Sequence, residues 1–549
     1  MNAPAAIADE SRNSLRFMGE SCESFDNTGV YPITASLTMQ LPALRRWSGR
    51  WSDAKPPHAP PAGILIAGVI SAILTVGLWG CTGSRAHPPN IILVLVDDLG
   101  HGDLSCHGNP VFSTPFMDKL HDESVRFTDF CVSATCSPSR AALMTGMHEF
   151  KSGVTHTEGG RERLALGTMT LAELLREHGY TTGIFGKWHL GAHGPYRPEE
   201  RGFEVSVTSV GDTQNSHFDP TLLHNGVPRA HKGFREDILF DEALGFIRAN
   251  RGKPFFCYIP TYSPHAPLRA PEKYLERCRK KFPEAVPAAY YAMVSDVDNN
   301  LGRLLEGLRD MGLEKDTIVI LMNDNGATYG VDRWNSGMRG CKGASWFGGS
   351  RALSFWRWPG HWQPRDEGRL TCHMDVLPTI ADLAGIRVSE KLRGELDGVS
   401  LRPLLEQGTA KWNAERMVFQ NVGRWPRGEA ERHGETFCGV RWNSMLLLRA
   451  APCDQADCKG MCRSTVPWRT MPGYTTNFAF HYALTPDQGW ALYDVASDPS
   501  CEHDLAADNP ATVERLRTAY REWWGKVLPI VDRADRSLDP RHRDSGGGE

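Results

Sequence analysis

The sequence lacks an excess of charge of either sign. Its 61 basic and 65 acidic residues leave a formal net charge of -4. This balance offers no overall positive charge for holding nucleic acid, so no nucleic-acid partner is expected and any attraction for an anionic substrate has to be local. The 41% hydrophobic and 23% charged residues are ordinary for a soluble globular protein, and 549 residues suffice for more than one domain.

Long apolar runs are also scarce, and residues 62–80 form the one that stands out. This segment has no charged residue and follows a basic stretch containing Arg45, Arg46, Arg50 and Lys55. A basic stretch followed by an apolar run is the plan of a secretory signal, so we expect an exported protein, periplasmic or extracellular. Because about 20 apolar residues can span a bilayer, an uncleaved membrane anchor is the alternative.

The end of this run resembles a bacterial lipoprotein cleavage box. Leu78, Trp79 and Gly80 precede Cys81, which would be the lipidated residue and would attach the protein to a membrane. Trp79 is bulkier than such a box usually has, so simple cleavage remains an equal alternative. The leader is long, and Met39 is an alternative start.

Three of the 14 cysteines, Cys453, Cys458 and Cys462, lie close together. Their spacing fits no common zinc-finger pattern, and no histidine lies within the cluster. Since an exported protein folds in an oxidising compartment, we expect a local disulfide cluster here rather than a zinc site, and pairing among many of the other cysteines.

The composition and residue patterns of the sequence divide the chain into four parts. They are a leader with a Pro-rich linker at 1–89, a catalytic domain at 90–396, a smaller C-terminal subdomain at 397–532 and a polar tail, expected to be disordered, at 533–549. In the C-terminal part, residues 438–450 and 489–495 are typical of antiparallel strands, and a helix is expected from about 511 to 527.

Short apolar runs alternate with helical stretches in the catalytic part. The runs are continuous, which is typical of strands buried on both faces, and they lie at 91–96, 181–185, 255–259 and 317–322. The helix candidates lie at 171–178, 237–250 and 290–311. This alternation predicts an α/β domain around a mainly parallel central sheet flanked by helices.

Polar side chains follow all four predicted strands. They are Asp97 and Asp98, Lys187 and His189, His265, and Asp324 and Asn325. Since ligands bind beyond the carboxyl ends of parallel strands, we expect them at one rim. Acidic residues after strands are often turn formers or helix caps. Two such runs beside cationic side chains nevertheless favour a site for an anion and a hard divalent ion, Ca²⁺ or Mg²⁺ rather than zinc.

Cys136 begins the segment CSPSRAALMTG at 136–146. Ser137 and Pro138 favour the first positions of a helix, so Cys136 is expected at the start of a short helix that ends near Gly146. Backbone N–H groups at such a position favour negative charge. From the residues alone, Cys136 is a thiolate nucleophile, a redox cysteine or a buried structural cysteine.

This segment closely resembles the first signature of the sulfatase family, whose leading cysteine is oxidised to formylglycine. Residues 179–189, GYTTGIFGKWH, resemble the second signature. Further similar segments follow the family's order over residues 90–506: NIILVLVDDLGHGDLSCHGNP, SPHAP, NDNG, MDVLPTIADLAG and LYDVASDPSCEHDLA. An ordered set of this kind is much more specific than one short motif.

The resemblance implies an alkaline-phosphatase-like α/β fold whose smaller C-terminal subdomain contains an antiparallel sheet and a helix. It also implies an arylsulfatase-like hydrolase that converts sulfate esters to an alcohol and inorganic sulfate. One calcium ion per chain is implied, with the ligands Asp97, Asp98, Asp324, Asn325 and the modified Cys136. A formylglycine-generating enzyme is the implied partner during maturation.

Six catalytic residues are implied: Cys136, Arg140, Lys187, His189, His265 and Lys342. In the hydrated aldehyde made from Cys136, one hydroxyl attacks sulfur and the second drives the elimination of sulfate, which a serine or an unmodified cysteine cannot do. Arg140 and Lys187 would stabilise the hydrate, and His189 would hydrogen-bond one of its hydroxyls. The last two residues of the set would hold sulfate oxygens, one of them helping to protonate the leaving group.

Two positions depart from the family pattern. Phe347 stands before Gly348 where sulfatases commonly carry an acidic residue, and His101 replaces the more usual tyrosine of the first motif. The sequence around Lys342 is rich in tryptophan and arginine, with Trp334, Trp346, Trp356, Trp358 and Trp362 and with Arg333, Arg339 and Arg351. They are either core residues or a receptor for a sulfated sugar.

A sulfated carbohydrate is therefore the expected substrate, with aryl sulfates as surrogates. Two alternatives remain. The first is a phosphoester or phosphonate ester hydrolase of the same superfamily. The second is a non-catalytic, exported carbohydrate-binding protein, suggested by Phe347 and the aromatic cluster.

Overall fold

The computed structural model describes residues 88–209, 217–331, 333–406, 412–423, 425, 428–449 and 489–536, without the side chains beyond 531. They belong to one unit, Ser84–Glu549. The apolar run 62–80, Cys81, the cysteines at 453–462 and the tail beyond 536 lie outside the described residues, so the expectations for them stay predictions. Within the described ranges, no helix is long and apolar enough to cross a membrane.

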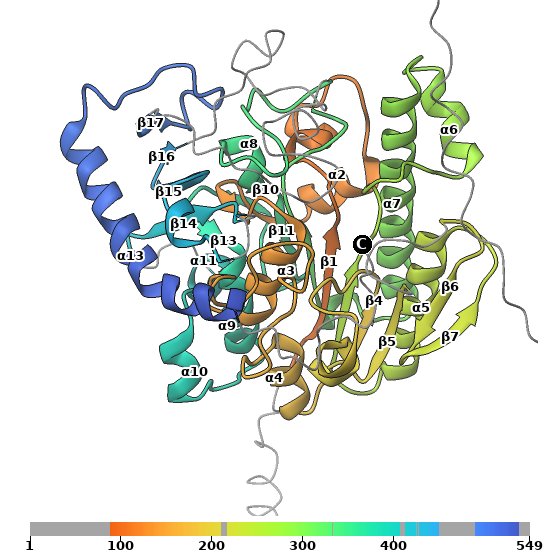
Figure 1. Cartoon of the computed structure of the whole chain (residues 1–549). Helices are drawn as coiled ribbons and strands as arrows, with labels where there is room; N and C mark the ends of the chain where they lie inside the picture. The colour runs from red at the N-terminus through yellow and green to blue at the C-terminus, as the bar shows by residue number, and fades with distance from the viewer. Residues whose placement is uncertain are drawn as a thin grey trace, which may run out of the picture. The chain divides into compact units, whose positions relative to one another are not determined.

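A ten-stranded sheet lies at the centre of this unit (Figure 1). Its middle strands are parallel neighbours, in the order β9 (Thr317–Asn323), β1 (Asn90–Val96), β8 (Phe255–Pro260), β4 (Thr181–Phe185) and β5 (Val205–Ser209). The margins contain antiparallel pairs, with β11 (Ser354–Arg357), β2 (Val125–Phe127) and β12 (Arg365–Glu367) beyond β9, and β6 (Thr221–His224) and β7 (Val227–Ala230) beyond β5. The expected mainly parallel central sheet is thus confirmed, with mixed margins.

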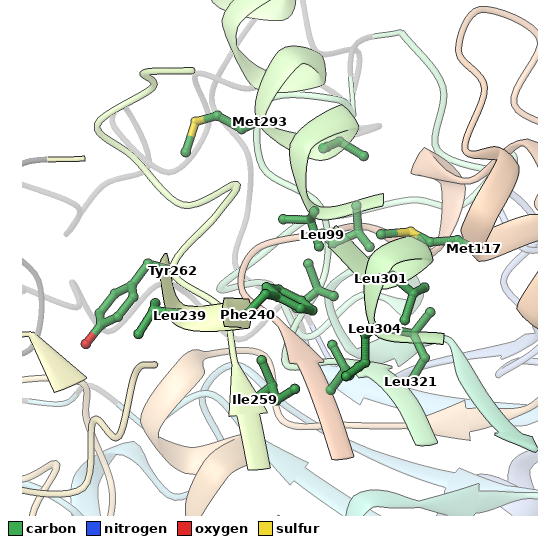
Figure 2. Close-up of a cluster of buried hydrophobic side chains, with 14 of the residues drawn as sticks. Leu99, Met117, Leu239, Phe240, Ile259, Tyr262, Met293, Leu301, Leu304 and Leu321 are labelled. Atoms are coloured by element: carbon green, nitrogen blue, oxygen red, sulfur yellow. The ribbon is translucent and has the colours of Figure 1, made fainter. Parts of the chain in front are cut away.

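Strand β1 is buried on both faces because its side chains enter two different cores. Ile92, Val94 and Val96 join a cluster with helices α2 (Pro115–Asp122), α5 (Arg235–Asn250), α6 (Glu272–Arg279) and α7 (Ala285–Asp310). Figure 2 shows part of that cluster, with Leu239 and Phe240 of α5 beside Ile259 of β8. Ile91, Leu93 and Leu95 face helices α3 (Cys136–Thr145), α4 (Leu171–Glu177), α9 (Val376–Leu383), α10 (Glu390–Glu395) and α11 (Arg402–Glu406).

A separate four-stranded antiparallel sheet follows in the C-terminal part. Its strands are β14 (Met417–Asn421), β15 (Cys438–Trp442), β16 (Met445–Arg449) and β17 (Ala491–Asp494). Helix α13 (Pro510–Arg536) packs on it through Leu516, Tyr520 and Trp524. The apolar face of α13 continues to Val527 and Val531, which explains why the helix runs further than the sequence indicated.

A short sheet joins β10 (Arg351–Ala352), β3 (Phe130–Cys131) and β13 (Thr371–Cys372). One expectation about the cysteines is wrong for the described residues, where no disulfide joins one cysteine to another. Cys257 on β8 and Cys438 on β15, for example, are fully buried in different hydrophobic cores, so tertiary packing keeps them apart.

Candidate active site

Four oxygen-bearing residues meet where β1 and β9 end. Val96 is in register with Asn323, so Asp97 and Asp98 leave one strand beside Asp324 and Asn325 leaving the other. The Asp98 N–H donates to Asp324 Oδ1 at 3.2 Å, and Asn325 Nδ2 donates to Asp98 Oδ1 at 2.9 Å. All four side chains are buried.

Cys136 joins this group from the first residue of α3. The helix ends at Gly146, whose left-handed φ of 67° and hydrogen bond to the Ala142 carbonyl terminate it. The Sγ atom of Cys136 lies 3.9 Å from Asp98 Oδ1. Burial raises the pKa of the Cys136 thiol to about 12, so an unmodified cysteine would be protonated here, which disfavours a thiolate nucleophile or a reactive redox thiol.

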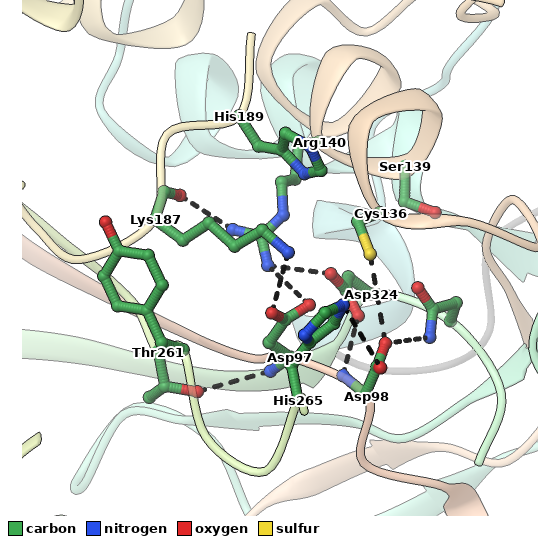
Figure 3. A network of polar contacts seen from close by, with 12 residues as sticks. Asp97, Asp98, Cys136, Ser139, Arg140, Lys187, His189, Thr261, His265 and Asp324 are labelled. Atoms are coloured by element: carbon green, nitrogen blue, oxygen red, sulfur yellow. Dashed lines mark hydrogen bonds and ion pairs between the residues drawn. The ribbon is translucent and has the colours of Figure 1, made fainter. Parts of the chain in front are cut away.

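Three cations surround the carboxylates, and Figure 3 shows the two that are fully buried, Arg140 and Lys187. Arg140, one turn along α3, contacts Asp324 Oδ2 at 2.7 Å and Asp97 Oδ1 at 3.2 Å. Lys187 Nζ lies 2.8 Å from Asp97 Oδ2, and Lys342 Nζ lies 2.6 Å from Asp98 Oδ1. Burial opposes the ionisation of Asp97, but Lys187 and the neighbouring cations outweigh it and hold its pKa well below the usual range.

Gly186, between β4 and Lys187, is required by the close approach of two chain segments. Its φ is 139°, and a Cβ atom there would lie 1.9 Å from the Pro260 carbonyl oxygen at the end of β8. The Lys187 N–H donates to that same oxygen at 2.7 Å. The glycine therefore lets the loops after β4 and β8 converge on the site.

The two histidines approach from these loops. His265 Nδ1 lies 2.6 Å from the Ala266 carbonyl and Nε2 lies 3.7 Å from Asp98 Oδ2. His189 has a φ of 58°, its Nε2 lies 3.0 Å from the Thr157 carbonyl, and its Nδ1 has no hydrogen-bond partner among the described residues. A carbonyl only accepts, so Nε2 carries the proton and Nδ1 is an acceptor. Burial lowers the pKa of His189 well below its usual value and keeps the ring neutral.

All ten residues singled out in the sequence therefore lie in one place, while the individual roles implied for them stay predictions. The donor set fits a hard divalent cation. Ligand atoms of Asp97, Asp98, Cys136 and Asp324 lie within 4.8 Å of one another, and the buried Asn325 Oδ1 has no hydrogen-bond donor in the described part of the chain. Three carboxyl groups face three cations, and a bound Ca²⁺ ion would add two positive charges that favour sulfate.

The sequence patterns missed several positioning residues. The Tyr290 hydroxyl on α7 lies 3.0 Å from the Asp98 carbonyl and 2.6 Å from Asp103 Oδ2, which also accepts from the Gly100 N–H. Burial raises the pKa of Asp103 to about 6. On α5, Glu236 accepts from the N–H and hydroxyl of Ser263 and so holds the loop that carries His265. Asp103 is visible in its motif, whereas nothing in the sequence distinguishes the other two.

The aromatic cluster near Lys342 mostly belongs to the core. Trp346, Trp356 and Trp362 are buried, and Arg339 stacks on the ring of Trp346 at 3.6 Å. The core interpretation is therefore confirmed for these three tryptophans, which cannot form an open receptor for a sugar.

Comparisons with known proteins agree with this geometry. The Sulfatase family model matches residues 89–386. Arylsulfatase A of Homo sapiens is 34% identical over 378 residues, which cover 61% of this chain and 71% of that protein. An arylsulfatase of Hemicentrotus pulcherrimus is 29% identical over 502 residues, covering 82% and 84% of the two chains. The crystal structure of Ps i-CgsB in complex with k-i-k-neocarrahexaose is similar with a TM-score of 0.67 and 25% identity, covering 80% of this chain and 93% of that one.

Proposed function

This chain belongs to the sulfatase family and is a sulfuric ester hydrolase, and we propose that it acts through a formylglycine derived from Cys136 and one bound calcium ion. The observation that carries this proposal is the position of Cys136, at the first residue of α3 and within 4.8 Å of three buried carboxylates. A protonated thiol at this point is a poor nucleophile, whereas the hydrate of an aldehyde supplies two hydroxyls on one carbon, one to attack sulfur and one to eliminate sulfate.

Calcium would contribute two positive charges next to the sulfate group. Asp97, Asp98, Asp324 and Asn325 would hold it, with the modified Cys136 as a further ligand. The carboxylates are already oriented for this role, because Arg140 binds two of them and Lys342 binds the third. Little rearrangement is then needed when the ion arrives.

Exposure separates the side chains that orient the site from those that can reach the substrate. The side chains of Arg140 and Lys187 are 0% and 1% exposed, whereas those of Lys342 and His265 are 16% and 29% exposed. Lys342 and His265 would therefore contact sulfate oxygens. The pKa of Lys342 is raised because Asp98 and other anions outweigh its burial. Lys342 is therefore protonated and would have a proton to donate to the departing alkoxide.

His189 has the protonation state of a general base. Its Nε2–H donates a hydrogen bond to the Thr157 carbonyl, and the acceptor Nδ1 has no hydrogen-bond partner among the described residues. We propose that Nδ1 accepts the proton of the second hydroxyl when sulfate is eliminated.

The carbohydrate part of the proposal rests on the similarity to Ps i-CgsB, whose structure contains k-i-k-neocarrahexaose. Sulfate release from a panel of sulfated oligosaccharides, compared with an aryl sulfate, tests it. A clear preference for the aryl sulfate over every oligosaccharide would contradict it.

Mass spectrometry of the proteolytic peptide that contains Cys136 tests the formylglycine directly. We expect loss of the sulfur atom and appearance of an aldehyde that a hydrazide reagent labels, in protein produced together with a formylglycine-generating enzyme. The Cys136→Ala protein, made in the same way, should not be labelled. Active enzyme with an unmodified thiol would contradict the proposal.

Two further assays separate the alternatives. Rates on matched sulfate, phosphate and phosphonate esters distinguish a sulfatase from a phosphoester or phosphonate hydrolase. Binding of a sulfated sugar without sulfate release, by protein whose Cys136 is fully modified, would favour a non-catalytic carbohydrate-binding protein.

We also propose that the protein is exported to the periplasm or the extracellular space, with membrane attachment through Cys81 as an alternative to release. The apolar run at 62–80 and the basic stretch that precedes it support export. Cell fractionation of the wild type and of Cys81→Ser tests it: lipidation predicts that only the wild type partitions with membranes.

A further inference from the structure

A second group of potential metal ligands lies at the far margin of the central sheet and includes no active-site residue. His224 ends β6, His231 follows β7, and Glu242 lies in α5. Figure 1 shows the β6–β7 hairpin beside α5 at this edge of the sheet. The three residues come from three elements, so tertiary folding brings them together.

The two imidazole rings face each other through their Nε2 atoms. These nitrogens are 2.9 Å apart, the ring planes differ by 10°, and the centroids are 5.1 Å apart. This is the geometry of two rings in a head-to-head N–H···N hydrogen bond, in which one Nε2 donates and the other accepts. A carboxylate oxygen of Glu242 lies within 4.8 Å of a ring nitrogen of each histidine.

The charges around this pair favour a cation. Glu242 forms no hydrogen bond or ion pair within the described ranges, and its negative charge acts on His224 against the positive charge of Arg229. Burial lowers the pKa of His224, which keeps its ring neutral and able to donate a lone pair. As metal ligands, two neutral imidazoles and one carboxylate carry a net charge of about −1.

We propose that His224, His231 and Glu242 bind a first-row transition metal ion of the zinc class. Two imidazoles and one carboxylate are a ligand set that zinc accepts, with water completing four-coordination, and imidazole donors disfavour Ca²⁺ and Mg²⁺. With Zn–N bonds of about 2.05 Å and tetrahedral angles, the two nitrogens would be about 3.3 Å apart. Each ring therefore needs to move only a few tenths of an ångström from the observed separation.

The proton balance of this binding is simple. In the hydrogen-bonded pair, one ring carries its proton on Nε2. When the metal takes both Nε2 lone pairs, that proton moves to Nδ1 of the same ring, so both histidines stay neutral and no net proton is released.

The metal would fasten an exposed edge to the core. All four residues of β7 are exposed, and the strand pairs on one side only, with β6. Helix α5 is anchored by Leu239, Phe240 and Phe246 in the large core. A bond from both strands of the hairpin to this helix would hold the sheet margin beside β5 and β4, the strand that precedes Lys187.

Zinc titration of the calcium-saturated protein tests the proposal, because saturation with Ca²⁺ protects the oxygen-rich active site. We expect one equivalent of Zn²⁺ to bind in isothermal titration calorimetry and to raise the melting temperature. Removing a direct ligand should weaken binding by about 100-fold or more, since loss of a supporting residue alone costs about 10–100-fold. The variants are His224→Asn and the conservative Glu242→Gln, each checked for native circular dichroism without zinc.

A matched control comes from another group, Cys106, His107 and His121, whose ligand atoms also lie within 4.8 Å of one another. Cys106→Ser should bind zinc like the wild type. X-ray absorption of the zinc-loaded wild type gives a readout independent of any variant, and we expect nitrogen and oxygen neighbours only. A sulfur neighbour, unchanged binding by both variants, or no saturable zinc binding by the wild type would overturn the proposal.

Discussion

The Lys342 ammonium lies 2.6 Å from Oδ1 of Asp98, although 244 positions separate the two residues. The same oxygen accepts from Asn325 and lies 3.9 Å from the Cys136 sulfur. Backbone hydrogen bonds from Lys342 N–H to the Ala327 carbonyl and from Gly343 N–H to the Ala134 carbonyl hold the lysine loop in place. Neither of these hydrogen bonds involves Phe347, the position at which the sequence departs from the family pattern.

Replacement of Cys136 should separate folding from catalysis. Cys136→Ala removes one buried sulfur atom at the start of α3 and should leave the melting temperature nearly unchanged while abolishing sulfate release, because nothing remains that can become formylglycine. Cys136→Ser, which cannot eliminate sulfate through a second hydroxyl, should be nearly as inactive. Substantial turnover by either variant in a sulfate-release assay would contradict the mechanism.

Replacement of Arg140 should destabilise the calcium-free protein. Arg140→Met leaves the buried Asp97 and Asp324 without their shared cation, a change that costs about 3–5 kcal/mol when one partner of a buried pair is removed. Urea unfolding measures it. The control is Arg402→Met, whose pair with Glu406 is exposed and should contribute less than about 1 kcal/mol. Equal losses in both variants would contradict the assigned role of Arg140.

Removal of calcium should lower both activity and stability. A chelator should abolish turnover and reduce the melting temperature, since an ion present at about 100 times its dissociation constant stabilises the folded state by about 2.7 kcal/mol. Calcium added back should restore both. Asp324→Asn, which removes one of the buried carboxylates, should make the melting temperature much less sensitive to the chelator. A wild type whose melting temperature ignores the chelator would argue against the metal site.

Variants of Phe347 should show whether stability and turnover depend on the side chain at this position, where sulfatases commonly carry an acidic residue. The ring is buried close to the guanidinium groups of Arg351 and Arg441, whose central carbons lie 5.1 and 5.0 Å from the ring centroid. Phe347→Ala should cost about 3–5 kcal/mol of stability. Phe347→Glu should lower stability less than Phe347→Gln, whose side chain has the same shape but no charge. The reason is that the two arginines compensate the charge of a buried carboxylate. We expect similar kcat in all folded variants, and a selective loss in Phe347→Glu would show that Lys342 depends on this position.

The stability contribution of Asp298 should depend on pH. Burial raises its pKa to about 7, although its Oδ1 accepts from the N–H groups of Met117 and Phe116 at 2.7 and 3.1 Å. The folded state therefore binds the Asp298 proton more tightly than the unfolded state, in which the pKa is about 3.9. The contribution of this proton to the free energy of unfolding is fully present below about pH 3.9 and is lost as the pH rises to about 7. Asp298→Asn keeps an acceptor oxygen but cannot ionise.

Asp298→Asn should therefore gain stability relative to the wild type as pH rises from about 5 to about 8. Urea unfolding at several pH values measures the difference. The exposed Asp310→Asn, at the end of the same helix, should show no such trend. A difference that stays constant or shrinks with rising pH would contradict the inferred pKa.

Much of the fold followed from local patterns. The strand predicted at 181–185 is β4 without a change of boundary, and 317–322 is β9 with one more residue. Continuous apolar runs reveal such strands because each of their faces meets a core. The helix around 290–311 starts earlier, at Ala285, where no apolar periodicity marks its first turn. Helix ends depend on such weak signals, so they are harder to predict than the existence of a helix.

The family, the central parallel sheet and the ten active-site candidates could be predicted from the sequence alone, because each depends on residues that are close in the chain. Three other findings required the folded chain: which tryptophans are core, that Tyr290 and Glu236 support the active-site loops, and that His224, His231 and Glu242 meet. These relationships join residues from different elements, and their geometry depends on strand order and helix packing, which no local pattern encodes.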